Sequence, residues 1–312
     1  MSESYSLISA REHYLMQPVV DAFTDYLADY IAGRVFDPPY LTQTYRPKAQ
    51  YCFTSLQDAW EQYIQEVPNR EFQERLIRYE KPLKEVIDKR DDEAFIQIVI
   101  DMFGEDSLVL NSNLETLQAS KNLCECTAYA CSQLADDSPE YTIFGKDFGP
   151  RMSSFHSRIY ATLLPDFITY ESRVCAALCY FIREYCISQD IKLPKELQLG
   201  SLQGWGKTKK DKGRDASWNG NVFQRLDTMK KRPMRERTFA NSNVLASWAV
   251  AEAIRKAKAN KEGSAWLEGP YPIRKFEAAL FMLGLSCRQF KKRLFRLSFP
   301  KLSTLLTLLV SG

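Results

Sequence analysis

Apolar residues recur at three- and four-residue spacing along most of this chain, which is the pattern of amphipathic α-helices. The first stripe consists of Val20, Phe23, Leu27 and Ile31, and the most regular one spans residues 174–186. Candidate strands, such as residues 95–100, are few and short. The periodicity therefore predicts a mainly α fold.

Breaks in this pattern and capping residues set the expected limits of the helices. We expect helices over residues 72–87, 114–134, 174–188, 244–258 and 273–285. The fourth would be capped by Asn241 and Asn243. A polar break at residues 136–139 separates an N-terminal helical region (1–135) from a second region (136–300) that precedes a hydrophobic tail (301–312). With 45% hydrophobic residues among 312, both regions can share one compact unit with two lobes.

Histidine and cysteine usage narrows the chemistry. Only His13 and His156 are present, so mechanisms and metal sites that need several imidazoles are excluded. The eight cysteines include no Cys-x-x-Cys pair. Burial as small apolar side chains is the simpler interpretation, but four cysteines leave a soft-metal or iron–sulfur site open: Cys124, Cys126, Cys175 and Cys179. We expect no metal site and no cofactor.

The chain has no feature that points to a membrane or to export. No stretch reaches the roughly 18 apolar residues that a spanning helix needs. The first residues lack the basic and apolar regions of a signal peptide. The sequence therefore predicts a soluble, cytoplasmic protein that makes no membrane contact.

Positive charge is concentrated in one stretch. Residues 201–237 contain 11 Lys or Arg against four acids, a net charge of +7 that leaves −4 for the remainder. A second basic cluster without acids lies at residues 288–301. Such asymmetry favours polyanionic partners, although a solvated loop is the alternative. Trp205 and Trp218 flank the lysine-rich run, and aromatic rings among cations are typical of nucleic-acid binding. The predicted DNA contacts of this run are Lys207, Lys209, Lys210, Lys212 and Arg214.

Residues 141–174 carry the most informative motif: a glycine turn, a helix, a short loop with proline, and an acid at the start of a second helix. Backbone N–H groups at such a turn form a cradle for a phosphate. Glu171 would lie near a helix N-terminus, where the helix dipole favours a carboxylate. A fixed carboxylate stabilises the oxocarbenium-like sugar that forms when an N-glycosidic bond breaks. A structural pairing of Glu171 with Arg158 or Arg173 is the alternative.

This stretch resembles the helix-hairpin-helix DNA glycosylase superfamily, in particular its 8-oxoguanine-DNA-glycosylase-like branch. Phe-Gly-Pro-Arg-Met-Ser (148–153) is similar to the second half of the DNA-anchoring hairpin, and Tyr-Glu-Ser-Arg-Val (170–174) is similar to the acid motif. The resemblance covers residues 141–188 and implies a two-lobed helical fold with DNA between the lobes. It implies that Glu171 is the catalytic carboxylate. The DNA contacts that it implies around the hairpin are Gly145, Lys146, Gly149, Arg151, Ser153 and Arg173.

Three positions differ from the family pattern. Asp147 stands where the first hairpin glycine usually is, and Glu171 replaces an Asp. Arg151 stands where bifunctional members have a nucleophilic Lys, and a guanidinium stays protonated at neutral pH. We therefore expect a monofunctional enzyme that leaves an abasic site. An extruded base would stack on an aromatic ring such as Trp205 or Trp218, although a tryptophan in the core is the more common finding.

The sequence thus predicts a DNA glycosylase-like protein that hydrolyses the N-glycosidic bond of a modified or damaged base, in DNA repair or antiviral defence. Three alternatives remain open. The first is a catalytically inactive DNA-binding or sensor module on the same scaffold, and the second is a glycosidase that acts on free nucleosides. The third is a helical interaction protein without a nucleic-acid role.

Overall fold

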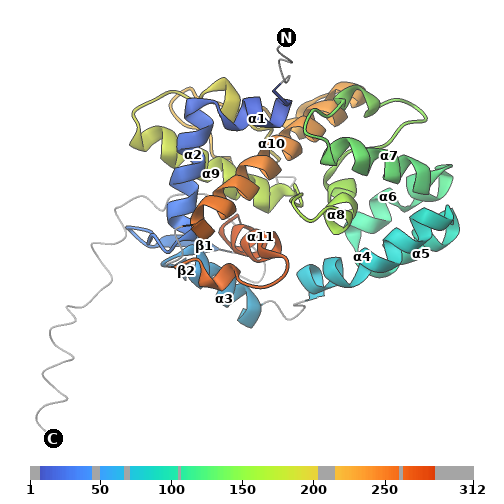
Figure 1. Ribbon diagram of the computed structural model, residues 1–312, viewed down its shortest axis with the longest axis horizontal. Coiled ribbons are helices and arrows are strands. Elements are labelled where there is room, and N and C mark those ends of the chain that lie inside the picture. Colours follow the sequence, from blue (N-terminus) through green and yellow to red (C-terminus); the bar gives the residue numbers. More distant parts are fainter. Residues whose placement is uncertain are drawn as a thin grey trace, which may run out of the picture.

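The structure, a computed structural model, describes residues 8–43, 50–66, 71–104, 107–202, 215–259 and 263–284. Within these ranges the chain is mainly helical, as predicted (Figure 1). The first helices are α1 (Ala10–Leu15), α2 (Pro18–Ile31), α3 (Leu56–Glu66), α4 (Glu71–Lys89), α5 (Asp92–Phe103) and α6 (Leu108–Ala119). The others are α7 (Leu123–Ala135), α8 (Ser154–Leu163), α9 (Ser172–Ser188), α10 (Arg232–Ala259) and α11 (Pro272–Leu283).

Buried apolar side chains form two clusters. The first joins α1, α2, α3, α9, α10 and α11, and it includes Phe23 and Ile182. The second joins α4, α5, α6 and α7, and it includes Leu83 and Phe95. In Figure 1, α2, α3 and α9 of the first cluster lie on the left, α4 to α7 lie on the right, and α10 runs diagonally across the upper half of the view. The N-terminal region 1–135 therefore contributes helices to both clusters.

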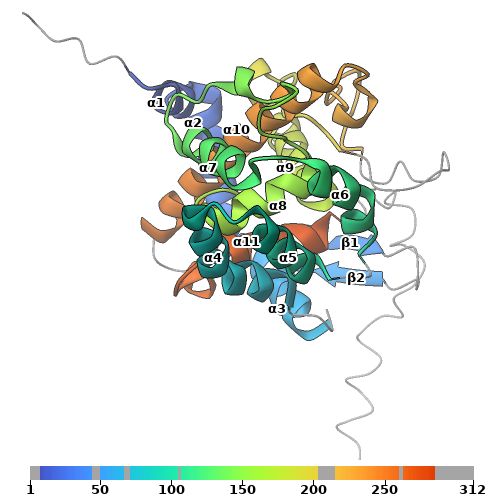
Figure 2. The same ribbon diagram turned by 90° about the vertical axis from the view of Figure 1, so that its right-hand side faces the viewer.

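Helix α8 joins the two clusters. Its side chains Phe155 and Ile159 belong to the second cluster, whereas Tyr160 and Ala161 belong to the first. Figure 2, in which the second cluster faces the viewer, shows α4 to α7 arranged around α8. Because seven of its ten residues are buried, α8 is a fixed support for the segments at its two ends.

Residues 95–100 are helical, so the prediction of a strand candidate there is wrong. They lie within α5, where the Asp91 carboxylate accepts a hydrogen bond from Ala94 N at 3.0 Å and caps the helix. Phe95, Val99 and Met102 are buried on one face. Their four- and three-residue spacing matches the helical period, and this burial outweighs the β-preference of a short isoleucine-rich run.

The single helix expected over residues 114–134 is two helices, α6 and α7. The chain turns at Asn122, whose φ of 57° is left-handed and cannot continue a helix. Helix α7 is capped from another helix, because the Asp92 carboxylate accepts from Leu123 N at 3.0 Å and from Cys124 N at 2.9 Å. A capping residue supplied by α5 leaves no local signal in the sequence of α7.

Helix α10 starts at Arg232, well before the predicted start at Val244. Asn241 and Asn243 lie inside this helix and do not cap it. Asn243 is fully buried, and its side-chain amide donates to Ile168 O at 2.9 Å. A tertiary contact therefore satisfies the asparagine that the sequence analysis assigned to a helix end.

Two short strands were not predicted. β1 (Tyr40–Gln43) and β2 (Gln50–Phe53) form an antiparallel pair, with Tyr40 opposite Phe53. The hydroxyl of Tyr40 donates to Leu283 O at 3.0 Å, which attaches this ribbon to the end of α11. Two strands of four residues depend on such packing, since a two-stranded ribbon is marginally stable alone. None of the described helices is both long and apolar enough to cross a membrane.

Candidate functional site

The predicted hairpin connects α7 to α8. A 3-10 turn at Tyr141–Ile143 leads into residues 144–153, which have no regular structure. Gly149 N donates to Lys146 O at 3.3 Å and closes a tight turn. The tip of this turn carries Lys146, Asp147 and Phe148, which are all exposed. The tip is therefore accessible to a partner.

The two hairpin glycines are required for different reasons. Gly145 has a left-handed φ of 81°, and a Cβ atom there would lie 2.4 Å from Pro233 Cα of α10. A Cβ atom at Gly149 would lie 2.7 Å from Ile143 O across the hairpin. Asp147 is not among the residues with positive φ. The left-handed residue of this hairpin is thus Gly145, and Asp147 keeps an ordinary backbone conformation.

The carboxylate of Glu236, on the second turn of α10, holds the end of the hairpin that leads into α8. It is 3% exposed and accepts from Arg151 Nε at 3.0 Å and from Met152 N at 3.2 Å. Arg151 was predicted to contact DNA, and in the structure its guanidinium lies in this ion pair with 30% of the side chain exposed. Glu236 was missed by the sequence analysis, since nothing local distinguishes it from a surface acid.

Ser153, another predicted DNA contact, is the N-cap of α8. Its Oγ atom accepts from His156 N at 3.5 Å and lies 2.8 Å from His156 Nδ1. The hydroxyl of Tyr160 donates to Arg151 O at 2.7 Å, one turn further along the same helix. The hairpin is therefore attached to α8 by side chains of α8 itself.

We expect the stability of the protein to decrease in mild acid because of His156. Burial, with a smaller effect of the Arg151 cation, lowers its pKa from 6.5 to about 3. The folded protein keeps this imidazole neutral, whereas the unfolded chain takes up a proton below about pH 6.5, so the stability is complete above pH 6.5 and declines from there towards pH 3. Between pH 7.5 and pH 5 the wild type should lose about 2 kcal/mol more than His156→Gln. Denaturant unfolding at both pH values measures this, and equal losses in the two proteins would contradict it.

Glu171 is the N-cap of α9. Its Oε1 atom accepts from Arg173 N at 2.9 Å and from Val174 N at 3.1 Å, and the residue is 8% exposed. Burial lowers the pKa of the Arg158 guanidinium. The nearby negative charges of Glu171 and Glu277 oppose this shift. The predicted placement of an acid at this helix N-terminus is confirmed. The alternative interpretation, in which Glu171 pairs with an arginine, is supported by the electrostatic interaction between Glu171 and Arg158.

A buried polar network holds the loop that carries Glu171. Ser157 Oγ accepts from Tyr170 N at 2.7 Å and donates to Asn243 Oδ1 at 2.7 Å. Ile168 N donates to Ser247 Oγ at 3.1 Å. Ser157 lies one helical turn, about 5.4 Å of rise, after Ser153 at the end of the hairpin. Helix α8 therefore brings the hairpin and the start of α9 close together.

Two charged residues of α11 complete this support. Arg274 and Glu277 are buried and paired with each other. Glu277 Oε1 accepts from Thr169 N at 2.5 Å, two residues before Glu171. Arg274 Nη2 donates to Ala161 O at 2.5 Å and to Phe167 O at 2.6 Å. The pair thus ties the end of α8 and the following loop to α11, and the sequence analysis did not identify it.

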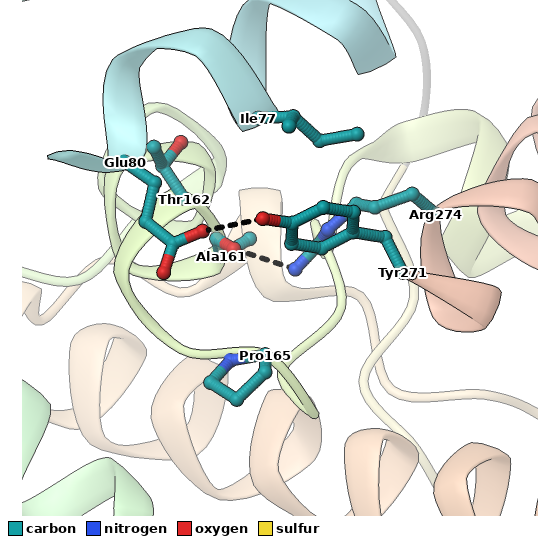
Figure 3. A pocket seen from close by; sticks show the side chains of 7 residues that line it. All are labelled: Ile77, Glu80, Ala161, Thr162, Pro165, Tyr271 and Arg274. Carbon is teal, nitrogen blue, oxygen red and sulfur yellow. Dashed lines mark hydrogen bonds between the residues drawn. The ribbon is translucent and has the colours of Figure 1, made fainter. Parts of the chain in front are cut away.

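A small pocket lies where α4, α8 and α11 meet (Figure 3). The residues that line it are Ile77, Glu80, Ala161, Thr162, Pro165, Tyr271 and Arg274. Tyr271 donates its hydroxyl to Glu80 Oε2 at 3.2 Å, and the charge of Glu80 raises the pKa of Tyr271. The volume of about 10 Å³ is the size of one water molecule. This pocket is therefore too small to receive a base.

The remaining predicted contacts fall in different places. Arg173 packs its guanidinium over the ring of Phe281, 4.1 Å from the centroid. Trp218 is half-buried and tilted against Phe223, with ring centroids 6.1 Å apart, so it contacts the first cluster. The other six predicted residues lie outside the described ranges: Trp205, Lys207, Lys209, Lys210, Lys212 and Arg214.

The cysteines of the soft-metal hypothesis do not gather in one place. Cys175 and Cys179 are buried in the first cluster, whereas Cys124 is buried in the second. Among the described residues, no group of three or more His, Cys, Asp or Glu side chains is arranged to hold a metal ion. The interpretation of these three cysteines as buried small side chains is confirmed.

Comparisons of the chain with protein-family models, with curated proteins and with solved structures found no match.

Proposed function

We propose that this chain is a DNA glycosylase-like protein that hydrolyses the N-glycosidic bond of a modified or damaged base. One observation carries the proposal. The loop before Glu171 is bound to α8 by the Tyr170 N to Ser157 Oγ hydrogen bond, one turn from the hairpin. The loop that carries this carboxylate is thus tied to the helix that begins at the end of the hairpin, and the hairpin has an exposed turn that can contact a DNA backbone.

In the proposed reaction the hairpin holds a phosphate, and the target nucleotide leaves the base stack. Glu171 stabilises the positive charge that develops on the sugar and orients the attacking water. Its Oε1 atom already accepts two backbone hydrogen bonds, so the second oxygen would act on the sugar and the water. Arg151 is an arginine paired with Glu236 and supplies no amine nucleophile, which supports hydrolysis without strand cleavage.

The fold of the helix-hairpin-helix glycosylases is part of this proposal. Helix α7, residues 136–153 and α8 would form the DNA-anchoring unit. The two apolar clusters would be the two lobes, and DNA would lie in the groove between them. The order hairpin, helix, loop and capping acid supports this assignment, since it is the order of the family motif.

A second candidate is DNA binding without hydrolysis, as expected of a sensor module on the same scaffold. The burial of Glu171 favours it, because 8% exposure leaves little room for a sugar unless the loop moves. Glu171 lines neither the pocket at α4, α8 and α11 nor a surface hollow at the start of α10, which is lined by Lys231, Pro233, Met234, Arg237 and Thr238.

The deciding experiment measures base release. The protein is incubated with genomic DNAs that include oxidised bacterial DNA and heavily modified viral DNA, and free bases are quantified by mass spectrometry. We expect release of one modified base, and a decrease to below about one-tenth in Glu171→Gln because the charge at the sugar is lost. Glutamine keeps an oxygen that can cap α9, so folding and DNA binding should persist. Glu171→Asp restores the family residue and should retain activity.

Glu252→Gln on α10 is the matched control, since Glu252, with 18% of its side-chain area exposed, pairs only with the exposed Arg255 among the ion pairs of the described residues. Unchanged release in Glu171→Gln would show that Glu171 is not catalytic. Salt-sensitive DNA binding without release of any base would favour the sensor module. Turnover of free nucleosides with no effect on DNA would favour a nucleoside glycosidase.

A further inference from the structure

Phe148 is almost completely exposed at the tip of the hairpin. Its side chain has 98% of its possible solvent-accessible area, the largest fraction among the large apolar side chains of the described residues. An exposed phenylalanine contributes nothing to folding through burial. At this exposed position, the ring of Phe148 is available to contact a binding partner.

Contacts from α10 and α7 hold the hairpin that carries Phe148. Gly145 packs against Pro233 of α10, and the neighbouring Asp147 accepts from Arg232 Nη2 at 2.7 Å. Arg237 Nε donates to Phe144 O at 3.2 Å, at the start of the hairpin. The thiol of Cys126 on α7 donates weakly to the carbonyl oxygen of Phe148 at 3.8 Å. The ring is thus presented on a braced backbone, so a partner would meet a preorganised surface.

The start of α10, which contacts the hairpin, is rich in cations. A surface hollow of about 450 Å³ adjoins the same helix turns that hold the hairpin, and its lining residues are Lys231, Pro233, Met234, Arg237 and Thr238. Among these described residues none is acidic. Two further lysines are exposed: Lys146 in the hairpin and Lys230 just before α10. Two acids lie in this region: Glu236 is buried, and Asp147 is 86% exposed but has its charge paired with Arg232.

We propose that Phe148 is a stacking platform for an unpaired base, with Lys146, Lys230 and Lys231 contacting the flanking phosphates. This inference rests on the proposed DNA-binding function and specifies its substrate class, which is DNA with unpaired or unstacked nucleotides. An aromatic ring stacks on any base whose face is free, whereas the bases of an intact duplex are covered by their neighbours. A protein partner would also bury Phe148, but exposed lysines, with the acid at the tip, Asp147, paired with Arg232, match phosphates better.

The test compares three labelled DNAs by fluorescence anisotropy: a single strand, the matching duplex, and the same duplex with an internal unpaired bubble. We expect wild-type protein to prefer the single strand and the bubble. Phe148→Ala should weaken binding to these two by about 5-fold to 100-fold and binding to the duplex by less than about 2-fold. Phe148→Trp should retain the preference. Lys231→Ala should weaken all three alike and reduce the salt dependence by about one ion.

Val35→Ala is the control for removal of an exposed apolar side chain, since Val35 is 61% exposed and lies between α2 and β1. It should change none of the three affinities. Equal affinity of the wild type for duplex and bubble, or equal weakening of all three DNAs by Phe148→Ala, would overturn the stacking role. Base release that persists in Phe148→Ala together with either result would leave the glycosylase proposal intact. A preference lost in Phe148→Ala in a protein that releases no base would leave the stacking role intact and reject the hydrolysis.

Discussion

Replacing Glu277 with alanine is expected to lower the free energy of unfolding by about 3–5 kcal/mol, because it leaves a buried arginine without its partner. Glu277 and Arg274 have 1% and 4% of their side-chain area exposed. The same substitution removes the acceptor of Thr169 N and one of the two carboxylates that stabilise the charge of Arg158. Denaturant unfolding of purified wild type and variant at pH 7 measures the difference.

A double-mutant cycle separates the ion pair from the other contacts of both residues. Arg274→Ala alone should also be severe, since it frees the carbonyl oxygens of Ala161 and Phe167 in a buried position. The double variant should cost less than the sum of the single variants by at least about 1 kcal/mol, because no uncompensated charge remains. Additive losses, or a loss below about 1 kcal/mol in Glu277→Ala, would show that water reaches this pair.

The second large effect is expected at Glu236. Glu236→Ala removes the acceptor of Arg151 Nε and Met152 N, and we expect a loss of about 2–3 kcal/mol. The loss should be smaller than at Glu277, since Arg151 is 30% exposed and can turn towards water. The hairpin should open locally, so hydrogen exchange of residues 144–153 should become faster than in the wild type, while exchange of α2 stays unchanged.

Glu252→Ala is the matched control, because it is the same substitution on the same helix. Glu252 pairs with Arg255, which is 67% exposed, so the loss should stay within about 1 kcal/mol. If Glu236→Ala and Glu252→Ala lose the same stability, or if exchange in the hairpin is unchanged, Glu236 does not hold the hairpin. Glu236→Gln should have an intermediate effect, since it keeps one acceptor oxygen.

Helix α2 could be predicted from the sequence, because one of its faces is buried along its whole length. Val20, Phe23, Leu27 and Ile31 of α2 are at most 2% exposed, as their spacing predicts. The errors occur at helix ends, in the short strands, and at residues 95–100, which lie inside α5. Helix α7 is capped by Asp92 of another helix, and α10 continues through Asn243 because that side chain bonds to the loop before Glu171. Propensity rules describe local contacts and miss partners supplied by distant segments.

The candidate site shows the same division. The glycine turn, the capping position of Glu171 and the helix between them follow from residues that are near in sequence. The surroundings of Arg151 do not, because its partner Glu236 is 85 residues away. The sequence analysis gave Phe148 no role of its own, and only the structure, with α7 and α10 packed beside the hairpin, shows that its side chain is exposed.

The sequence by itself determined the helical class and the order of hairpin, helix and acid, because periodicity and turn chemistry act over a few residues. The tertiary structure alone decided which charged groups are buried and what they contact. Thr169 and Glu277, whose hydrogen bond holds the loop of Glu171, are separated by 108 residues. A buried charge is stable only with a partner in place, and packing of distant helices supplies that partner.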